Sequence, residues 1–189
     1  MTATVQLRLM GPEPGESHLF MKWLSKRYGA RLATIKLRVG NADLFDRVVA
    51  TEFSHEDALV RVACPFPEPA LSPAIVREAL LRRIDGVLLV LASRRTELDA
   101  NAAVVAEMVP RLKVMGIEPF VALNDSMRGD AKTTLSATAA AAELGLAGSI
   151  HETTLGPPRG PIEYDEGVDA AWAALLERSM KPKGSTPYR

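Results

Sequence analysis

The chain has 189 residues, with 23 basic and 23 acidic side chains and a single cysteine, Cys64. This length is enough for one domain with a substantial core, and the balanced charge gives no indication of nucleic-acid binding. A lone cysteine excludes an internal disulfide, which suits a reducing cytoplasm. There is no signal-peptide pattern, and the longest apolar run, Val87 to Ala92, is too short to cross a bilayer. We expect one cytoplasmic globular domain over residues 1–180 and a flexible tail over 181–189.

The first predicted elements are a strand, a glycine-containing loop and a helix. Val5 to Met10 alternates apolar and polar residues, Gly11 to Ser17 forms the turn, and His18 to Lys26 has apolar residues at helical spacing. The helix is expected to end near Gly29. A strand that leads through a glycine-bounded loop into a helix N-terminus is the framework of a phosphate-binding loop.

This loop departs from the phosphate-binding pattern G-x-x-x-x-G-K-[ST]. From Gly11 to Gly15 it is one residue short, and Glu16 replaces the lysine that neutralises the phosphates. Ser17 keeps the hydroxyl that holds Mg²⁺ in the motif. Because a carboxylate would repel phosphates, we interpret the loop as part of a nucleotide-binding architecture whose chemistry has been lost. Two other roles remain open: Ser17 as helix cap, with Glu16 favourable at the helix dipole, and Glu16 as an internal occupant of the phosphate site.

An antiparallel hairpin and a proline-rich segment are predicted next. The strand-like runs are Ala33 to Val39, Arg47 to Phe53 and Ala58 to Cys64, and Ser54 to Asp57 turns between the last two. The three prolines of Pro65 to Pro69 exclude regular structure, so this segment is either a rigid connector or a frozen switch presented to a partner. Ser72 and Pro73 are typical of a helix start, with Ile75, Val76, Ala79 and Leu80 forming its apolar face.

Strands and helices alternate through the second half of the chain. Ile84 to Ser93 is a continuous apolar run that predicts a central parallel strand. The other predicted elements are a helix at Thr96 to Met115 loosened at Pro110, a strand at Pro119 to Leu123, a helix at Lys132 to Leu144 closed by Gly145, a strand at Ser149 to Thr153, and a helix at Val168 to Met180. This order predicts an α/β fold: a mostly parallel sheet of six or seven strands, with one antiparallel edge hairpin and helices on both faces.

The order of these elements and three local stretches resemble the small Ras-like GTPases of bacteria, particularly the MglA-like branch that governs cell polarity and gliding motility. The stretches are Gly11-Pro12 after the first strand, Arg77 to Val87, and Ser93 to Met108. The resemblance extends over Thr4 to Met180. It implies a Ras-like P-loop fold.

The motifs that carry the chemistry of that family are altered. The second switch falls on Cys64 to Pro69, which offers neither a glycine amide for a γ-phosphate nor a glutamine to orient water. The guanine-reading N-K-x-D falls on Asn124 to Met127, where only the asparagine remains. The last base-contacting loop lies near Thr153 to Pro158. The resemblance therefore implies a pseudo-GTPase with no catalytic residue, whose vestigial nucleotide-binding positions are Gly11, Gly15, Glu16, Ser17 and Asn124.

The resemblance also implies a surface for a protein partner, such as a roadblock-type protein docking over the switch face. That face would be Leu44 to Phe53 and Pro65 to Arg77, and its candidate contact residues are Phe45, Val49, Phe53, Phe66, Glu68 and Ile75. For Phe66, burial in the core is an equal alternative to anchoring a partner. We expect a partner, scaffold or regulator in a polarity, motility or trafficking system, with no cofactor.

Two alternatives keep a nucleotide. One is a divergent GTPase that uses GTP or GDP with Mg²⁺, in which Ser17 and Asn124 contribute and Arg159 or a partner supplies the missing cation. The other is a switch that binds nucleotide without turnover. His18, His55 and His151 have no metal-ligand spacing, and Cys64 is expected in the core rather than as a nucleophile.

Overall fold

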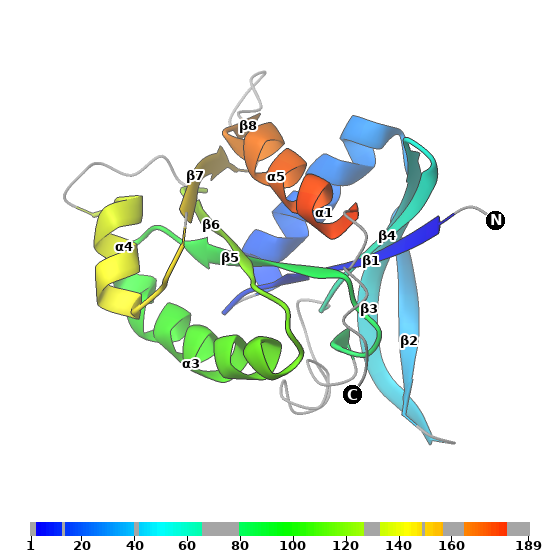
Figure 1. Ribbon diagram of the computed structural model, residues 1–189, viewed down its shortest axis with the longest axis horizontal. Helices are drawn as coiled ribbons and strands as arrows, with labels where there is room; N and C mark the ends of the chain where they lie inside the picture. The colour runs from blue at the N-terminus through cyan, green and yellow to red at the C-terminus, as the bar shows by residue number, and fades with distance from the viewer. Residues whose placement is uncertain are drawn as a thin grey trace, which may run out of the picture.

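The structure, a computed structural model, describes residues 3–12, 14–39, 42–65, 80–126, 133–148, 150–156 and 165–180. Eight strands and four α-helices lie in these ranges (Figure 1). In chain order the elements are β1 (Ala3–Met10), α1 (Pro14–Tyr28), β2 (Ala33–Val39), β3 (Ala42–His55), β4 (Ala58–Pro65), β5 (Gly86–Ala92), the 3₁₀ turn η1 (Arg95–Glu97), α3 (Leu98–Val114), β6 (Phe120–Asn124), α4 (Ala137–Leu144), β7 (Ile150–Leu155), β8 (Asp165–Glu166) and α5 (Val168–Met180).

All eight strands form one mixed sheet in the order β2-β3-β4-β1-β5-β6-β7-β8. The five central strands, β4 to β7 in that order, are parallel, whereas β2 with β3, β3 with β4, and β7 with β8 pair antiparallel. The predicted α/β class, mostly parallel sheet and β3–β4 hairpin are confirmed. The predicted count of six or seven strands is wrong, because the two-residue β8 is too short to show a hydrophobic period.

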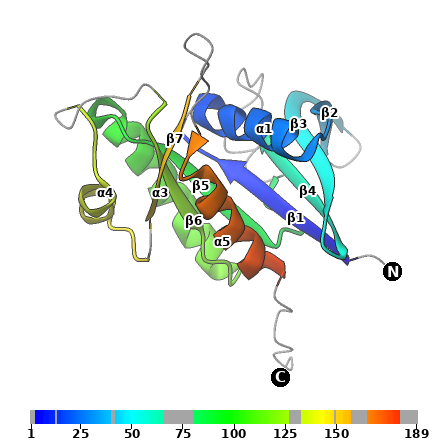
Figure 2. The same cartoon turned by 90° about the horizontal axis from the view of Figure 1, so that it is seen from above.

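Helices cover both faces of the sheet, as predicted. Apolar residues of α1 and α5 pack with β1, β3 and β4 in one core cluster, and residues of α3 and α4 pack with β5 and β6 in a second. Figure 2 shows α1 running alongside β3 and β4. At the junction of α5 with the sheet, a side chain at Gly86 would meet the Ser179 hydroxyl at 2.3 Å, so a glycine allows this close approach.

The hydrophobic patterns account for the main elements. In β1 the residues Val5, Leu7 and Leu9 are buried and alternate with half-buried polar residues, while all seven residues of β5 are buried. Helix α5 has the predicted bounds, and Trp172 and Leu176 lie in its buried face.

Several boundaries differ from the prediction. Helix α1 begins at Pro14, before the expected His18, and α4 begins at Ala137, where the Ser136 hydroxyl accepts a hydrogen bond from the Ala139 amide. Helix α3 continues through Pro110. Its buried residues are Asn101, Val104, Val105, Met108 and Leu112, and Leu98, Ala102 and Val109 are partly buried beside them.

Some predictions fall outside the described residues: the proline-rich segment after Pro65, the helix expected from Ser72, and the tail at 181–189. Within the described residues, no helix has the length and apolarity needed to cross a bilayer.

Candidate functional site

The predicted phosphate loop is largely helix. Because α1 starts at Pro14, Gly15, Glu16 and Ser17 lie in its first turn, and the connection from β1 is only three residues long, beginning at Gly11. A phosphate cradle depends on consecutive backbone N–H donors, and Pro12 and Pro14 have none. The two prolines are a signal in the sequence that our motif comparison missed. The prediction that Ser17 caps the helix is wrong, because Ser17 lies inside it.

The Glu16 carboxylate is buried against the ends of β6 and β7. Its side chain is only 7% exposed. One carboxylate oxygen accepts a hydrogen bond from the Asn124 side-chain amide, and the other accepts one from the Ser126 hydroxyl at 2.8 Å. The structure therefore brings together two of the predicted vestigial positions, Glu16 and Asn124, although 108 residues separate them in the sequence.

Asn124 connects this carboxylate to β7. Its Oδ1 accepts hydrogen bonds from the Leu155 amide at 2.8 Å and the Thr153 hydroxyl at 3.0 Å, and its Nδ2 also donates to the Leu155 carbonyl at 2.8 Å. The side chain is 1% exposed. Because both polar atoms of Asn124 are engaged within the chain, this side chain joins α1, β6 and β7. We call Glu16, Asn124, Ser126, Thr153 and Leu155 the Glu16 cluster.

Burial raises the pKa of the Glu16 carboxyl above its ordinary value. Hydrogen bonds from Asn124 and Ser126 and the nearby positive charge of Arg94 act in the opposite direction, and the negative charge of Asp125 adds to the rise. The environment thus disfavours the charged form of Glu16 and would disfavour a second negative charge beside it.

Two buried hydroxyl groups lie in the same part of the fold. Ser17 is fully buried in α1 and Ser93, which follows β5, is 4% exposed. Neither side-chain oxygen has a hydrogen-bond partner within the described ranges. Ser17 is the residue that carries the Mg²⁺-binding hydroxyl in the intact motif, and it is the one predicted vestigial position whose polar side-chain atom has no partner there.

The predicted partner-binding residues do not form one accessible set. Val49 and Phe53 are 3% and 6% exposed and belong to the core cluster with α1, and the Phe53 ring stacks on Tyr28 at 3.8 Å. Their side chains therefore face the inside of the protein, because alternate residues of β3 point to opposite faces of the sheet. The side chain of Phe45 and the residues Phe66, Glu68 and Ile75 lie outside what the structure describes.

The cysteine and two of the histidines noted in the sequence lie in environments that give them structural roles. Cys64 is fully buried, as predicted, and burial raises its thiol pKa to about 12, which leaves it protonated and unreactive at neutral pH. His55 lies edge-on to Tyr28, and His151 stacks on Phe120. Among the described residues, no group of three histidine, cysteine, aspartate or glutamate side chains is arranged to hold a metal ion.

Sequence reasoning missed Ser126, Thr153 and Leu155 as members of the cluster. The only local signal was their position directly after or at the ends of predicted strands, where carboxyl ends of parallel strands meet at one edge of the sheet. Comparison with models of known protein families finds no match to this chain, and comparison with curated proteins finds none either.

Proposed function

We propose that this chain is a Ras-like domain that has lost nucleotide chemistry and acts by binding other proteins, as a partner, scaffold or regulator in a polarity, motility or trafficking system. The observation that carries the proposal is the Glu16 carboxylate, buried beside the first turn of α1 and hydrogen-bonded by Asn124 and Ser126. A helix N-terminus that follows the first strand of a parallel sheet is where a phosphate binds in nucleotide-binding folds. Here the chain places its own carboxyl group in that part of the fold.

Three features support the loss of binding. Pro12 in the connection from β1 and Pro14 at the start of α1 have no amide donor, the lysine position holds a carboxylate, and Asn124 is engaged by β7. The strand order, with β1 between the β3–β4 hairpin and β5, is compatible with a P-loop architecture. A domain that keeps this architecture without nucleotide chemistry is suited to protein recognition.

The test is a titration of the full chain with GTP and GDP, with and without Mg²⁺, followed by thermal unfolding. We expect no shift in melting temperature at millimolar nucleotide. A nucleotide present at a hundred times its Kd would stabilise the protein by about 2.7 kcal/mol, which is a readily measured shift. The matched control is Glu16→Gln, which removes the charge and keeps the shape. It too is expected not to bind, because Pro12 and Pro14 still lack amides.

A divergent GTPase that binds or slowly hydrolyses GTP is the second candidate function. The fully buried Ser17 hydroxyl, which has no hydrogen-bond partner within the described ranges, favours it, since a Mg²⁺ ligand would be left in this state without its metal. A shift of several degrees with Mg²⁺-GTP that is lost in Ser17→Ala would decide for this function and against the proposed one.

A further inference from the structure

A groove crosses the sheet face opposite α1, over β2, β3, β4 and β1. Its volume is about 590 Å³. The strand register explains it: Ala33, Ala50 and Ala63 lie side by side on three neighbouring strands, and Arg8 of β1 is next in the same row. Because these three neighbouring positions all hold alanine, no large side chain rises from this row, and it forms the floor of the groove.

Larger side chains form the two walls. On one side Ile35 lies opposite Val48, and on the other Glu52, Arg61 and Gln6 form a polar row. Val48 and Glu52 are four residues apart on β3, which separates the walls by about 13 Å. An α-helix with its side chains is about 10–12 Å wide, so one face of a helix fits between them.

The pairing of the strands beneath the floor favours a bound helix over a bound extended peptide. Strands β1, β3 and β4 are hydrogen-bonded on both sides within the sheet, so a peptide lying across the floor cannot pair with them. Only β2, at the edge of the sheet, has a free side, and that side is at the end of the groove and not on its floor. A helix pairs its own backbone N–H and C=O groups and binds a partner through its side chains. The alanine floor and Ile35, which is 51% exposed, offer apolar contacts of that kind.

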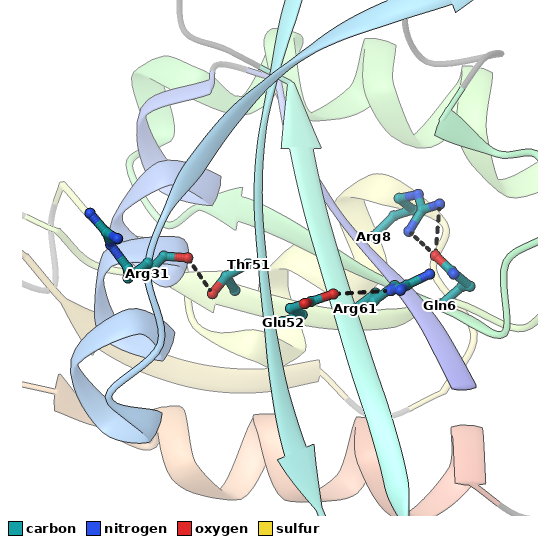
Figure 3. Close-up of polar contacts among 6 residues, drawn as sticks. All are labelled: Gln6, Arg8, Arg31, Thr51, Glu52 and Arg61. Atoms are coloured by element: carbon teal, nitrogen blue, oxygen red, sulfur yellow. Dashed lines mark hydrogen bonds and ion pairs between the residues drawn. The ribbon is translucent and has the colours of Figure 1, made fainter. Parts of the chain in front are cut away.

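The groove is lined by more basic than acidic side chains: Arg8, Arg31 and Arg61 against Glu52 (Figure 3). Arg61 pairs with Glu52 at 3.2 Å, and Arg8 donates to the Leu80 carbonyl at 2.7 Å and lies in the field of Asp85. Arg31 lies at the opposite end of the row, where the Thr51 hydroxyl donates to its carbonyl at 3.0 Å. Its guanidinium is exposed and has no ion pair within the part of the chain that the structure describes. The end of the groove over β2 therefore has an uncompensated positive charge.

We infer that this groove docks an amphipathic helix of a partner protein, with an apolar stripe over the alanines and acidic side chains at the end that reaches Arg31. The inference rests on the proposed function and names the partner chemistry. It also places the partner surface on the face of β3 opposite Val49 and Phe53. On that face Val48 is as buried as Val49, at 3%, whereas Ala50 is half-buried and Glu52 is exposed.

The test uses two fluorescein-labelled peptides of about 20 residues with the same leucine and alanine stripe. One carries glutamates at one end and the other carries lysines in their place. Fluorescence anisotropy with the full chain is expected to show binding of the glutamate peptide and about tenfold weaker binding of the lysine peptide. Arg31→Glu should reverse that preference, because it replaces the positive charge by a negative one.

A second variant tests the floor. Ala50→Trp fills the groove and is expected to abolish peptide binding, whereas Ser54→Trp, on the same face of β3 beyond the polar wall, should leave it unchanged. Both variants are expected to keep the melting temperature of the natural chain within about 4 °C. A larger fall in Ala50→Trp alone, or failure of that variant to fold, would show that another part of this chain fills the groove, and would overturn the inference.

Equal binding of the two peptides, binding of neither, or unchanged binding by Ala50→Trp would also overturn it. These outcomes do not affect the proposed function, which stands or fails on the nucleotide titration and on a partner bound elsewhere.

Discussion

Glu16 is the residue whose chemistry differs most from its sequence context. In the phosphate-binding pattern its position holds the lysine that neutralises the phosphates, whereas here it is a carboxylate buried by α1, β6 and β7. Hydrogen bonds from Asn124 and Ser126 compensate part of the cost of burying the charge, and the raised pKa shows that burial outweighs them. This balance makes Glu16 a source of pH-dependent stability.

Glu16→Gln tests that balance. Because the pKa of Glu16 is higher in the folded than in the unfolded protein, the folded state binds the proton more tightly, and the associated stability is present below the unfolded pKa of about 4.5 and lost as pH rises through the folded pKa. We expect the stability of Glu16→Gln relative to the natural chain to improve as pH rises from 4 to 8. Urea unfolding across this range measures it. A difference that is independent of pH would contradict the raised pKa.

Asn124→Ala tests the connection between α1 and β7. The substitution leaves the Leu155 amide and carbonyl and one oxygen of Glu16 without their partner, and we expect a loss of about 3 kcal/mol in unfolding free energy.

Asn101→Ala is the matched control, because Asn101 is equally buried and, within the described residues, its side chain bonds the backbone of Ala92 alone. Both variants should be destabilised, but only Asn124→Ala should change the pH dependence that Glu16 produces. An identical pH profile in the two would show that Asn124 does not act on the carboxylate.

At the scale of the elements, Trp172 is the largest of the five buried side chains that hold α5 in place. Trp172 is 2% exposed, packs near Phe53 and donates to the Tyr28 hydroxyl at 3.1 Å, so it joins α5 to both α1 and β3. Helix α5 lies over the centre of the sheet, where it passes Gly86 of β5 at close range. The stability of the α1–α5 layer therefore depends on this contact.

We expect Trp172→Ala to lower the free energy of unfolding by about 3–5 kcal/mol, because it removes a buried indole. Chemical denaturation measures the loss. Glu177→Ala on the exposed side of the same helix should change it by about 0.5 kcal/mol or less. A loss below about 1 kcal/mol in Trp172→Ala would mean that the layer repacks without the indole.

For the whole molecule, the proposed loss of nucleotide chemistry predicts a single conformational state. A working switch reorganises around the γ-phosphate and Mg²⁺. Here Glu16 holds α1 against β6 and β7 without a ligand. We expect the hydrogen-exchange profile of the full chain to be the same with and without Mg²⁺-GTP, including over residues 62–77, where the second switch of the family falls. Nucleotide-dependent protection anywhere in that range would contradict this prediction.

Local pattern was sufficient to predict most of the elements. The alternation in β1, the apolar run of β5, the β3–β4 hairpin and the helical spacing of α5 each depend on residues close together in the chain, because secondary structure buries one face with a fixed period. The same reasoning gave the α/β class. It failed at α1, which begins at Pro14 and not at the expected His18, and at β8, which is too short to have a period.

The side of the sheet to which each residue points was decided by the tertiary structure. Val48 and Val49 are adjacent and both apolar, so alternation alone could not say which belongs to the α1 side; in the structure Val49 lies beneath α1 and Val48 forms a wall of the groove. The resemblance likewise singled out Glu16 and Asn124 as candidate positions, but the sequence could not predict their hydrogen bond. That contact joins residues 108 positions apart, and it exists because β1 and β6 end at the same edge of the sheet.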